Sequence, residues 1–597
     1  MSSLPPLDIH SLHEAYRSGD LTPKQLVHQI HARIVASADS AIWINVFSLE
    51  ELERFCEVLE HQSIEELPLF GVPFAIKDNI DVQGLPTTAA CPDFSYEPNH
   101  SAHVVHQLMT AGAIPIGKTN MDQFATGLVG VRSPYGTPQN ALHPDYIPGG
   151  SSSGSAVAVA EQFVSFALGT DTAGSGRIPA AFNNLVGHKP SKGLLSTSGI
   201  VPACRSLDCV SIFAHNAADA ERVFCVSAYY DPEDPYAREC TYLERIPLYG
   251  EEFVFGVPFG DQLEFFGNEE SHDLFYAAVR KLQERGGIPL EIDFSPFIEA
   301  AKLLYEGPWV AERYIAIEDI LQERPEILHS VTRSIIEGGA LPSAVDAFKA
   351  EYQLKEHKRR ADLTFDGVSF ILTPTAGTTY TVDAVKADPV ALNTNLGYYT
   401  NFMNLLDFAA TAIPAGFYEN GMPFGVTAFA PAFHDLPLLD LAAKFAKTLP
   451  ETSNTDEQTD DQIPEDLVPV IVCGAHLEGQ PLNWQLSERG GFPWKKTYTA
   501  PIYEFFALPP VGDTIPPRPG VKRVTDGGSS IYVEVWLLPI ENFGSFVAAI
   551  PEPLGIGKVT LEDGVTQYPG FICEGFALEN AQNISHLGDW RRFVAGE

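Results

Sequence analysis

Hydrophobic residues recur at helical spacing near the start of the chain. Thr22 stands where an N-cap hydroxyl accepts a backbone hydrogen bond, and Pro23 suits the first helical position. The apolar stripe that follows has four members: Leu26, Val27, Ile30 and Ile34. The pattern predicts an amphipathic helix from Pro23 and a second helix over 49–61.

Short apolar runs then alternate with longer helical segments. Four runs have the length and composition of buried strands: 72–76, 113–118, 253–258 and 368–374. Three segments read as helices: 101–112, 120–127 and 270–287. Repeated strand–helix alternation predicts an α/β fold, in which one sheet carries helices on both faces.

The pattern changes at residues 449–466, LPETSNTDEQTDDQIPED. This stretch is acidic, lacks aromatic residues and has proline near both ends, so we interpret it as a linker. The β-prone, aromatic segments VPVIVCG, SIYVEVWLLPI and YPGFICEGFAL follow. We therefore expect a first domain over 1–448, a linker over 449–466 and a smaller α+β domain over 467–597.

Composition narrows the classes of function. The formal net charge of −39 disfavours nucleic acid or an anionic membrane as a partner. The eight cysteines are scattered without a CxxC pair, which is typical of reduced thiols in a cytoplasmic protein. The chain begins with polar residues and has no apolar run of about 18 residues, so we expect neither secretion nor a membrane span.

Two serine clusters among glycines are the main candidates for chemistry: Gly149–Ser155 and Thr172–Gly176. Glycine lets backbone N–H groups approach a ligand, and hydroxyls among such amides suggest a nucleophile beside an oxyanion hole. The alternative is a pair of flexible Gly/Ser linkers. Linkers seldom enclose apolar helix- and strand-forming sequence such as that between the clusters.

Lys77 ends the predicted strand 72–76, where burial of its ammonium group is costly. Desolvation that lowers its pKa from about 10.4 toward 7–8 costs about 4 kcal/mol and yields a general base. A bridging serine, Ser151, would then relay the proton from a nucleophile, Ser175. The alternative for Lys77 alone is a side chain that reaches solvent at a strand edge.

Other residues invite competing interpretations. His100, His103 and His106 suggest a metal site, but no carboxylate joins them and their three-residue steps drift around a helix, so we expect no metal. Cys209 has apolar neighbours and no nearby histidine, which favours an inert core thiol. Gly150–Gly154 also satisfies the GxSxG pattern, with Ser152 as nucleophile, but a loop rather than a strand precedes it.

The motifs GVPFAIKDNI, Gly149–Ser155 and GTDTAGSGR resemble those of the amidase signature family. The resemblance covers roughly residues 10–450 and implies a central mixed β-sheet flanked by helices on both sides. It also implies that Lys77 is the base, Ser151 a relay serine after a cis peptide bond, and Ser175 the nucleophile. The oxyanion hole would be formed by the N–H groups of four residues: Thr172, Ala173, Gly174 and Ser175. Many members have glycine where this chain has Ser153.

Within that family, the chain resembles the allophanate hydrolases most. The segments that carry the resemblance are 169–193, 305–314 and, in the C-terminal domain, 473–483, 534–539 and 550–559. It implies that Tyr305 and Arg313 bind a substrate carboxylate, for which the planar guanidinium is well suited. It also implies a weaker backbone contact at Gly127. His476 would be a candidate base of the C-terminal domain, and Arg177 lies near the nucleophile with a role that can be purely structural.

The resemblance implies a reaction as well. The enzyme would release ammonia from allophanate and leave N-carboxycarbamate, and the C-terminal domain would promote decarboxylation or serve assembly. No cofactor is implied. A homodimer and a separate urea carboxylase are the expected partners in urea degradation. Three alternatives remain open: another amidase, the glutaminase subunit of a tRNA amidotransferase, and a non-catalytic scaffold.

Overall fold

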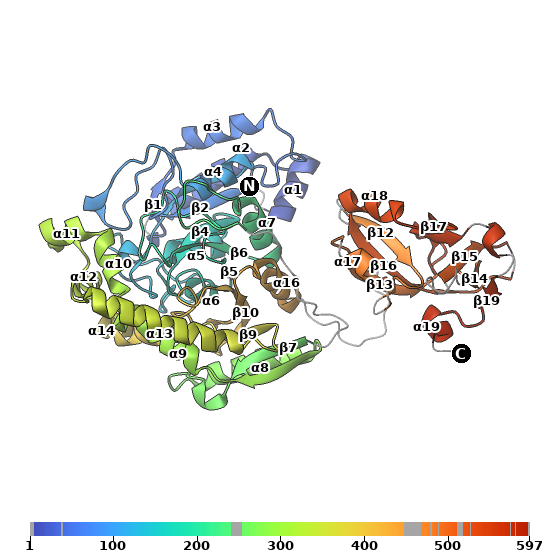
Figure 1. Cartoon of the computed structure of the whole chain (residues 1–597). Coiled ribbons are helices and arrows are strands. Elements are labelled where there is room, and N and C mark those ends of the chain that lie inside the picture. The colour runs from blue at the N-terminus through green and yellow to red at the C-terminus, as the bar shows by residue number, and fades with distance from the viewer. Residues whose placement is uncertain are drawn as a thin grey trace. The chain divides into compact units, whose positions relative to one another are not determined.

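The structure is a computed structural model of the chain. It describes residues 5–594, except for 38–39, 240–252, 447–466, 478–479, 481, 488, 510–517, 526, 574 and 579–580. The chain divides into two compact units, Met1–Pro450 and Glu451–Glu597, which we describe separately (Figure 1). The predicted linker lies outside the described residues.

The first unit is built on an 11-stranded sheet. Both parallel and antiparallel neighbours occur: β2 pairs in parallel with β3 and β4, whereas β4 and β6 are antiparallel. The strand order is β1 (Trp43–Val46), β3 (Ile114–Thr119), β2 (Pro73–Lys77), β4 (Phe166–Asp171), β6 (Cys209–Ala214), β5 (Val186–Lys189), β10 (Phe408–Phe417), β11 (Pro423–Pro431), β9 (Phe370–Pro374), β7 (Phe253–Pro258) and β8 (Gly287–Ile292). This mixed sheet confirms the predicted fold class.

Helices cover both faces of the sheet. Along β9, Phe370 and Leu372 belong to one hydrophobic cluster and Ile371 to another, and successive side chains of a strand point to opposite faces. The Phe370 cluster includes residues of α8 (Glu269–Gln283) and α16 (Asp435–Ala446). The Ile371 cluster includes residues of α9 (Ser295–Glu306) and α13 (Ala344–Leu363).

The first unit contains further α-helices before and between these elements. They are α1 (Ile9–Ser18), α2 (Pro23–Ala36), α3 (Leu49–Leu59), α4 (His103–Thr110), α5 (Ser153–Ala160), α6 (Ile178–Phe182), α7 (Ala217–Ser227), α10 (Val310–Ala316), α11 (Glu318–Glu323), α12 (Ser330–Glu337), α14 (Val382–Ala387) and α15 (Ala391–Leu396). The start of α2 is as predicted, with the Thr22 side chain accepting from the N–H of Gln25. No helix in the described part of the chain has the length and hydropathy of a bilayer span.

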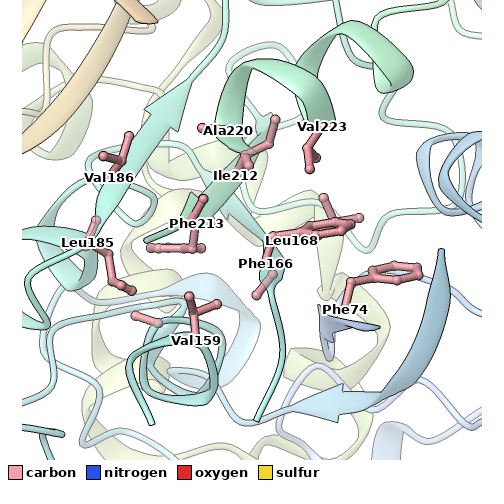
Figure 2. Packing of buried hydrophobic residues seen from close by; sticks show 14 of the residues in the cluster. Phe74, Val159, Phe166, Leu168, Leu185, Val186, Ile212, Phe213, Ala220 and Val223 are labelled. Atoms are coloured by element: carbon pink, nitrogen blue, oxygen red, sulfur yellow. The ribbon is translucent and has the colours of Figure 1, made fainter. Parts of the chain in front are cut away.

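Figure 2 shows the packing around the central strands. The rings of Phe74 on β2 and Phe166 on β4 stack with centroids 5.2 Å apart. Ile212 of β6 lies beside Ala220 of α7, whereas the next residue, Phe213, lies toward Val159 of α5. The end of β4, which leads into the second serine cluster, and α5, which begins within the first, thus lie in a close-packed core, which limits their movement.

One predicted element is wrong. The segment 120–127 forms no α-helix; only a short 3₁₀ turn, η3 (Gln123–Ala125), occurs there. Phe124 and Ala125 have positive φ angles of 50° and 51°, which end any regular helix. His100 lies outside α4, so the three histidines do not share one helix, and His103 contacts Gln107 and Asp231 instead.

The second unit contains two further sheets. One has five strands in the order β13 (Phe492–Tyr498), β16 (Tyr532–Pro539), β12 (Leu467–Val472), β18 (Gln567–Cys573) and β17 (Leu554–Thr560). The other has the order β15 (Arg518–Arg523), β14 (Tyr503–Leu508) and β19 (Gln582–Asn583). Its helices are α17 (Trp484–Ser487), α18 (Ile540–Ala548) and α19 (Trp590–Val594). The unit has its own hydrophobic cluster, which includes Val470, Trp536 and Phe571.

Candidate active site

Lys77 is the last residue of β2, a strand whose five residues are all buried. Its Nζ atom lies 2.8 Å from Ser151 Oγ and 2.8 Å from Thr170 Oγ1. Burial lowers the pKa of Lys77 to about 7, although the nearby carboxylates of Asp122 and Asp171 favour the charged form. A substantial fraction of this amine is therefore uncharged at neutral pH and able to accept a proton.

Ser151 follows a cis peptide bond from Gly150. Its carbonyl accepts the N–H of Asp122 at 3.0 Å. A Cβ atom at Gly150 would lie 2.2 Å from Asp122 Oδ2 and 2.5 Å from the N atom of Gly130, so only glycine fits there. The close approach of the loop that contains Asp122 and Gly130 explains why the serine cluster begins with glycine.

Asp122 organises that loop. Its carboxylate accepts the backbone N–H groups of Val129, Gly130 and Arg132 at 2.9–3.2 Å. Sequence reasoning missed this residue and also missed Thr170. Thr170 directly precedes Asp171 at the end of β4, next to the second serine cluster, and that position was the available signal.

Ser175 is buried, with 3% of its surface exposed. Its Oγ donates to the carbonyl of Gly127 over 3.5 Å. Ser175 and Ser151 both lie in the described part of the chain, and no hydrogen bond joins their side chains. The 127–130 segment contacts both serine clusters, because the Leu128 carbonyl accepts the N–H of Gly150. The structure thus brings Lys77 and Ser151 together and sets Ser175 against the same loop.

The loop after β4 is anchored by a buried ion pair. Arg177 Nε and Nη2 each donate to a different oxygen of Asp171 at 2.9 Å, and neither side chain is exposed. Burial by itself raises the pKa of Asp171, but Arg177, Lys189 and the N–H of Gly176 together outweigh burial and hold that pKa below its usual value. The pairing with Asp171 gives Arg177 a structural role in this loop.

The same carboxylate changes the expected oxyanion hole. Asp171 Oδ1 accepts the N–H of Gly174 at 2.8 Å, so this donor is already occupied. Gly174 has φ 134°, and a Cβ atom there would lie 2.4 Å from Thr400 Oγ1. In this conformation the Gly174 N–H is committed to Asp171, and its role as an oxyanion donor stays a prediction. The described residues offer no acceptor to the N–H groups of Thr172, Ala173 and Ser175.

Arg313 lies on α10 and is only 2% exposed. Its Nη1 donates to Thr126 Oγ1 at 3.0 Å and to the Ala125 carbonyl at 3.3 Å, and its guanidinium lies 5.7 Å from the Tyr305 ring centre. Within the described ranges, no aspartate or glutamate forms an ion pair with it. Burial alone would lower the pKa of Arg313, but Tyr305, Cys204 and the carboxylates of Asp208 and Glu312 together raise it, so the guanidinium stays charged. Without an ion-pair partner of its own, it keeps donors for a carboxylate ligand.

Gly127 connects this arginine to the nucleophile candidate. It follows Thr126, which contacts Arg313, and its carbonyl accepts from Ser175. A Cβ atom at Gly127 would lie 2.6 Å from Asp122 Oδ2. Arg132, which sequence reasoning also missed, donates to the Thr126 carbonyl at 2.9 Å and lines a pocket of about 330 Å³ together with Tyr305.

The two alternative nucleophiles, Ser152 and Cys209, lie in surroundings that do not activate them. Ser152 Oγ donates to the Thr170 carbonyl at 3.2 Å, and Ser152 precedes α5 without a strand before it. Burial raises the pKa of the Cys209 thiol, which keeps it protonated. Among the described residues, no group of three or more His, Cys, Asp or Glu side chains is arranged to hold a metal ion.

His476 lies in the second unit. Its ring stacks on Phe571 with centroids 5.0 Å apart, and Nε2 lies 2.9 Å from Gln485 Oε1. Burial lowers the pKa of His476, so the neutral ring predominates. If Nε2 carries the proton donated to Gln485, Nδ1 keeps the lone pair that a base requires.

Comparison with known proteins gives consistent results for the two units. A family model described as Amidase matches residues 25–439, and one described as Allophanate hydrolase C-terminal domain matches residues 468–595. The chain is 44% identical to urea amidolyase of Saccharomyces cerevisiae over 582 residues, which cover 94% of this chain. The chain spans 31% of the length of that relative.

Two further likenesses concern a shorter relative and a solved structure. A glutamyl-tRNA(Gln) amidotransferase subunit from Lacticaseibacillus paracasei is 32% identical over 73% of this chain and 96% of its own length. The structure of Kluyveromyces lactis allophanate hydrolase matches with a TM-score of 0.78 and 40% identity, covering 100% of both chains. The chain therefore belongs to the amidase family and carries a C-terminal domain of the allophanate hydrolase type.

Proposed function

We propose that this chain is an allophanate hydrolase, which cleaves the terminal amide of urea-1-carboxylate. The observation that carries the proposal is a buried lysine–serine pair, Lys77 and Ser151, in the same site as Arg313, a buried arginine without a carboxylate partner among the described residues. The pair supplies acid–base chemistry for amide cleavage, and the arginine supplies charge for an anionic substrate. The likeness to urea amidolyase and allophanate hydrolase supports the same reaction.

In the proposed mechanism, neutral Lys77 accepts a proton from Ser151, which in turn accepts one from Ser175. Ser175 Oγ attacks the terminal amide carbon, and the proton returns to the leaving nitrogen as ammonia departs. Water then hydrolyses the acyl-enzyme and releases N-carboxycarbamate. This relay requires Ser175 to come within hydrogen-bond distance of Ser151 once substrate is bound, since catalytic contacts often tighten only then.

The developing oxyanion needs preorganised donors. We assign them to the N–H groups of Thr172, Ala173 and Ser175, because the Gly174 N–H is committed to Asp171. Loss of one such donor typically costs about 3 kcal/mol of transition-state stabilisation.

We propose that Arg313 and Tyr305 bind the substrate carboxylate and that the backbone at Gly127 contacts the substrate. Only one nitrogen of Arg313, Nη1, donates hydrogen bonds to Thr126 and Ala125. A guanidinium has two further nitrogens and five N–H donors in all, which suffices for a carboxylate. An uncharged amide or a glutamine side chain would leave the free donors of Arg313 without a charged acceptor, so we expect the site to favour allophanate over the substrates of other amidases.

The second unit would act on the product. We propose that it promotes decarboxylation of N-carboxycarbamate, with His476 as the candidate base. Its neutral ring supports that role. Allophanate is a carboxylated urea, so the reaction that supplies it is a urea carboxylation, and we propose functional coupling to a urea carboxylase. We also propose a cytoplasmic homodimer without a metal or organic cofactor.

The test is a product assay on the full chain. Wild type is expected to release ammonia from allophanate, whereas Ser175→Ala is expected to lose that release while keeping its circular dichroism spectrum and melting temperature. Glutamine and simple amides serve as comparison substrates. Faster ammonia release from glutamine than from allophanate would favour the amidotransferase alternative, and wild-type turnover in Ser175→Ala would refute the triad. A wild-type chain inert toward every amide would indicate a scaffold.

A further inference from the structure

A second pocket of the first unit, apart from the one beside Tyr305, is rich in basic side chains. Its volume is about 340 Å³. Five of its 13 lining residues are lysine or arginine, whereas the whole chain has 38 such residues among 597. They are Lys192, Arg205, Arg238, Lys355 and Lys358. In a chain with a net charge of −39, so dense a group of basic side chains indicates a candidate binding site for an anion.

Two of the five cations have carboxylate partners. Arg238 donates to both oxygens of Asp407 at 2.8 and 2.9 Å, and Lys358 pairs with Asp362. The other three, Lys192, Arg205 and Lys355, have no ion pair with any aspartate or glutamate in the described ranges. Asp208 is the remaining acid of the lining, and burial raises its pKa.

The three unpaired cations line the pocket from separate segments of the chain. Lys192 Nζ donates weakly to the Ser206 carbonyl at 3.5 Å, and Arg205 stands 5.8 Å from the ring centre of Tyr236, which also lines the pocket. Lys355 projects from α13. Burial lowers the pKa of Lys192, although Asp407 favours its charged form. Three basic side chains from separate segments that converge without ion-pair partners of their own suit a ligand that carries two negative charges.

The pocket wall also contacts two parts of the active site. Ser206 donates through its N–H and its hydroxyl to Glu312 at 2.8 and 2.5 Å, and Glu312 directly precedes Arg313 on α10. Asp208 Oδ1 accepts the hydroxyl of Thr172, which stands in the proposed oxyanion loop. A ligand that shifts the 205–208 segment therefore acts on both the carboxylate-binding helix and the loop.

We propose that this pocket is a binding site for a small dianionic oxyanion, and that its occupancy changes substrate binding in the active site. Hydrogen phosphate and dicarboxylates share the required chemistry. The first product of the proposed reaction, N-carboxycarbamate, is a dianion of this kind, and this last identification alone rests on the proposed function. The pocket thus offers a means of product feedback.

The test measures binding by isothermal titration calorimetry with the full chain, at a pH where hydrogen phosphate is the main species. Hydrogen phosphate and succinate are the dianionic probes, and acetate is the monoanionic one. The double variant Arg205→Gln/Lys355→Gln removes two exposed cations. Lys349→Gln, also exposed on α13 but outside this pocket, is the matched control.

We expect wild type and Lys349→Gln to bind at least one dianion more tightly than acetate, and the double variant to bind it at least ten-fold more weakly. Whichever of hydrogen phosphate and succinate binds more tightly shows whether the pocket prefers a phosphate or a dicarboxylate. The same dianion should change KM in wild type and in the control, but not in the double variant, whose turnover without anion stays normal. Equal dianion binding in all three proteins, or an unchanged KM in wild type, would overturn the proposal.

The calorimetric arm uses no allophanate, so it remains informative if the proposed function fails. In that case KM is measured with whichever amide the chain hydrolyses. Failure of the pocket proposal would conversely leave ammonia release from allophanate unaffected, and the two outcomes are therefore distinguishable.

Discussion

At the scale of single residues, the chemistry depends on a lysine that burial keeps partly uncharged. Lys77 is fully buried, and its hydrogen-bond partners are the hydroxyls of Ser151 and Thr170 and, more weakly, the Thr170 carbonyl. A shift of the pKa from 10.5 to about 7 corresponds to roughly 5 kcal/mol against the charged form. Packing of the surrounding sheet has to offset this free-energy cost of burying the amine.

The first prediction concerns the pH dependence of this base. Because only neutral Lys77 accepts a proton, kcat/KM should fall about tenfold for each pH unit below about 7 and level off above it. The measurement is the pH profile of kcat/KM for wild type at constant ionic strength. The residual activity of Lys77→Ala should lack this titration. A wild-type profile that stays flat through neutrality would contradict the assignment.

The second prediction concerns Arg313. Replacement by alanine should raise KM for allophanate about ten- to a hundred-fold, because a charge-assisted hydrogen bond contributes about 1.5–3 kcal/mol. An uncharged amide of similar size is the control substrate, and its KM should change far less. Equal effects on both substrates would mean that Arg313 does not bind the carboxylate.

At the scale of elements, the loop after β4 holds its shape through one buried ion pair. Asp171 accepts two bonds from Arg177 and the N–H groups of Gly174 and Gly176. The carboxylate thus fixes the turn that carries Ser175. Removal of one partner of a buried pair leaves an uncompensated charge, which is far more costly than loss of an exposed pair.

We therefore predict that Asp171→Asn lowers the free energy of unfolding by about 3–5 kcal/mol and reduces kcat through the distorted loop. Glu337→Gln is the matched control, since it breaks the exposed pair with Arg333 and should cost less than about 1 kcal/mol. Urea denaturation followed by fluorescence measures both. Equal stability losses in the two variants would show that the Asp171 pair does not anchor the loop.

At the scale of the whole molecule, each unit has a hydrophobic core of its own. The clusters around Phe370 and Ile371 belong to the first unit, and the cluster around Trp536 belongs to the second. All the residues proposed for deamination lie in the first unit, whereas His476 lies in the second. Separate cores predict that each unit folds alone.

The last prediction follows from this division. A chain of residues 1–450 should release ammonia from allophanate at a rate close to that of the full chain, while residues 467–597 should be inactive in that assay. Carbon dioxide measured from both reactions tests the second unit, and full-length His476→Ala should slow its release without slowing ammonia release. Loss of deamination in a folded 1–450 chain would show that the second unit is needed for catalysis.

Local features of the fold could be predicted from the order of residues. Helical and strand periodicity indicated α2, α3 and the buried strands, because such patterns depend on residues close together along the chain. Glycines around the serines and a lysine at a strand end indicated where chemistry would lie. The resemblance then supplied roles for Lys77, Ser151 and Ser175, which remain predictions until the variants are measured.

Which of those residues come into contact depends on the folded chain. Lys77 contacts Ser151 and Thr170 across 74 and 93 residues, and Arg313 contacts Thr126 across 187. The commitment of the Gly174 N–H to Asp171 and the absence of a helix over 120–127 likewise depend on the folded backbone. The physical reason is that hydrogen-bond partners and desolvation are properties of three-dimensional packing, which the order of residues along one segment does not reveal.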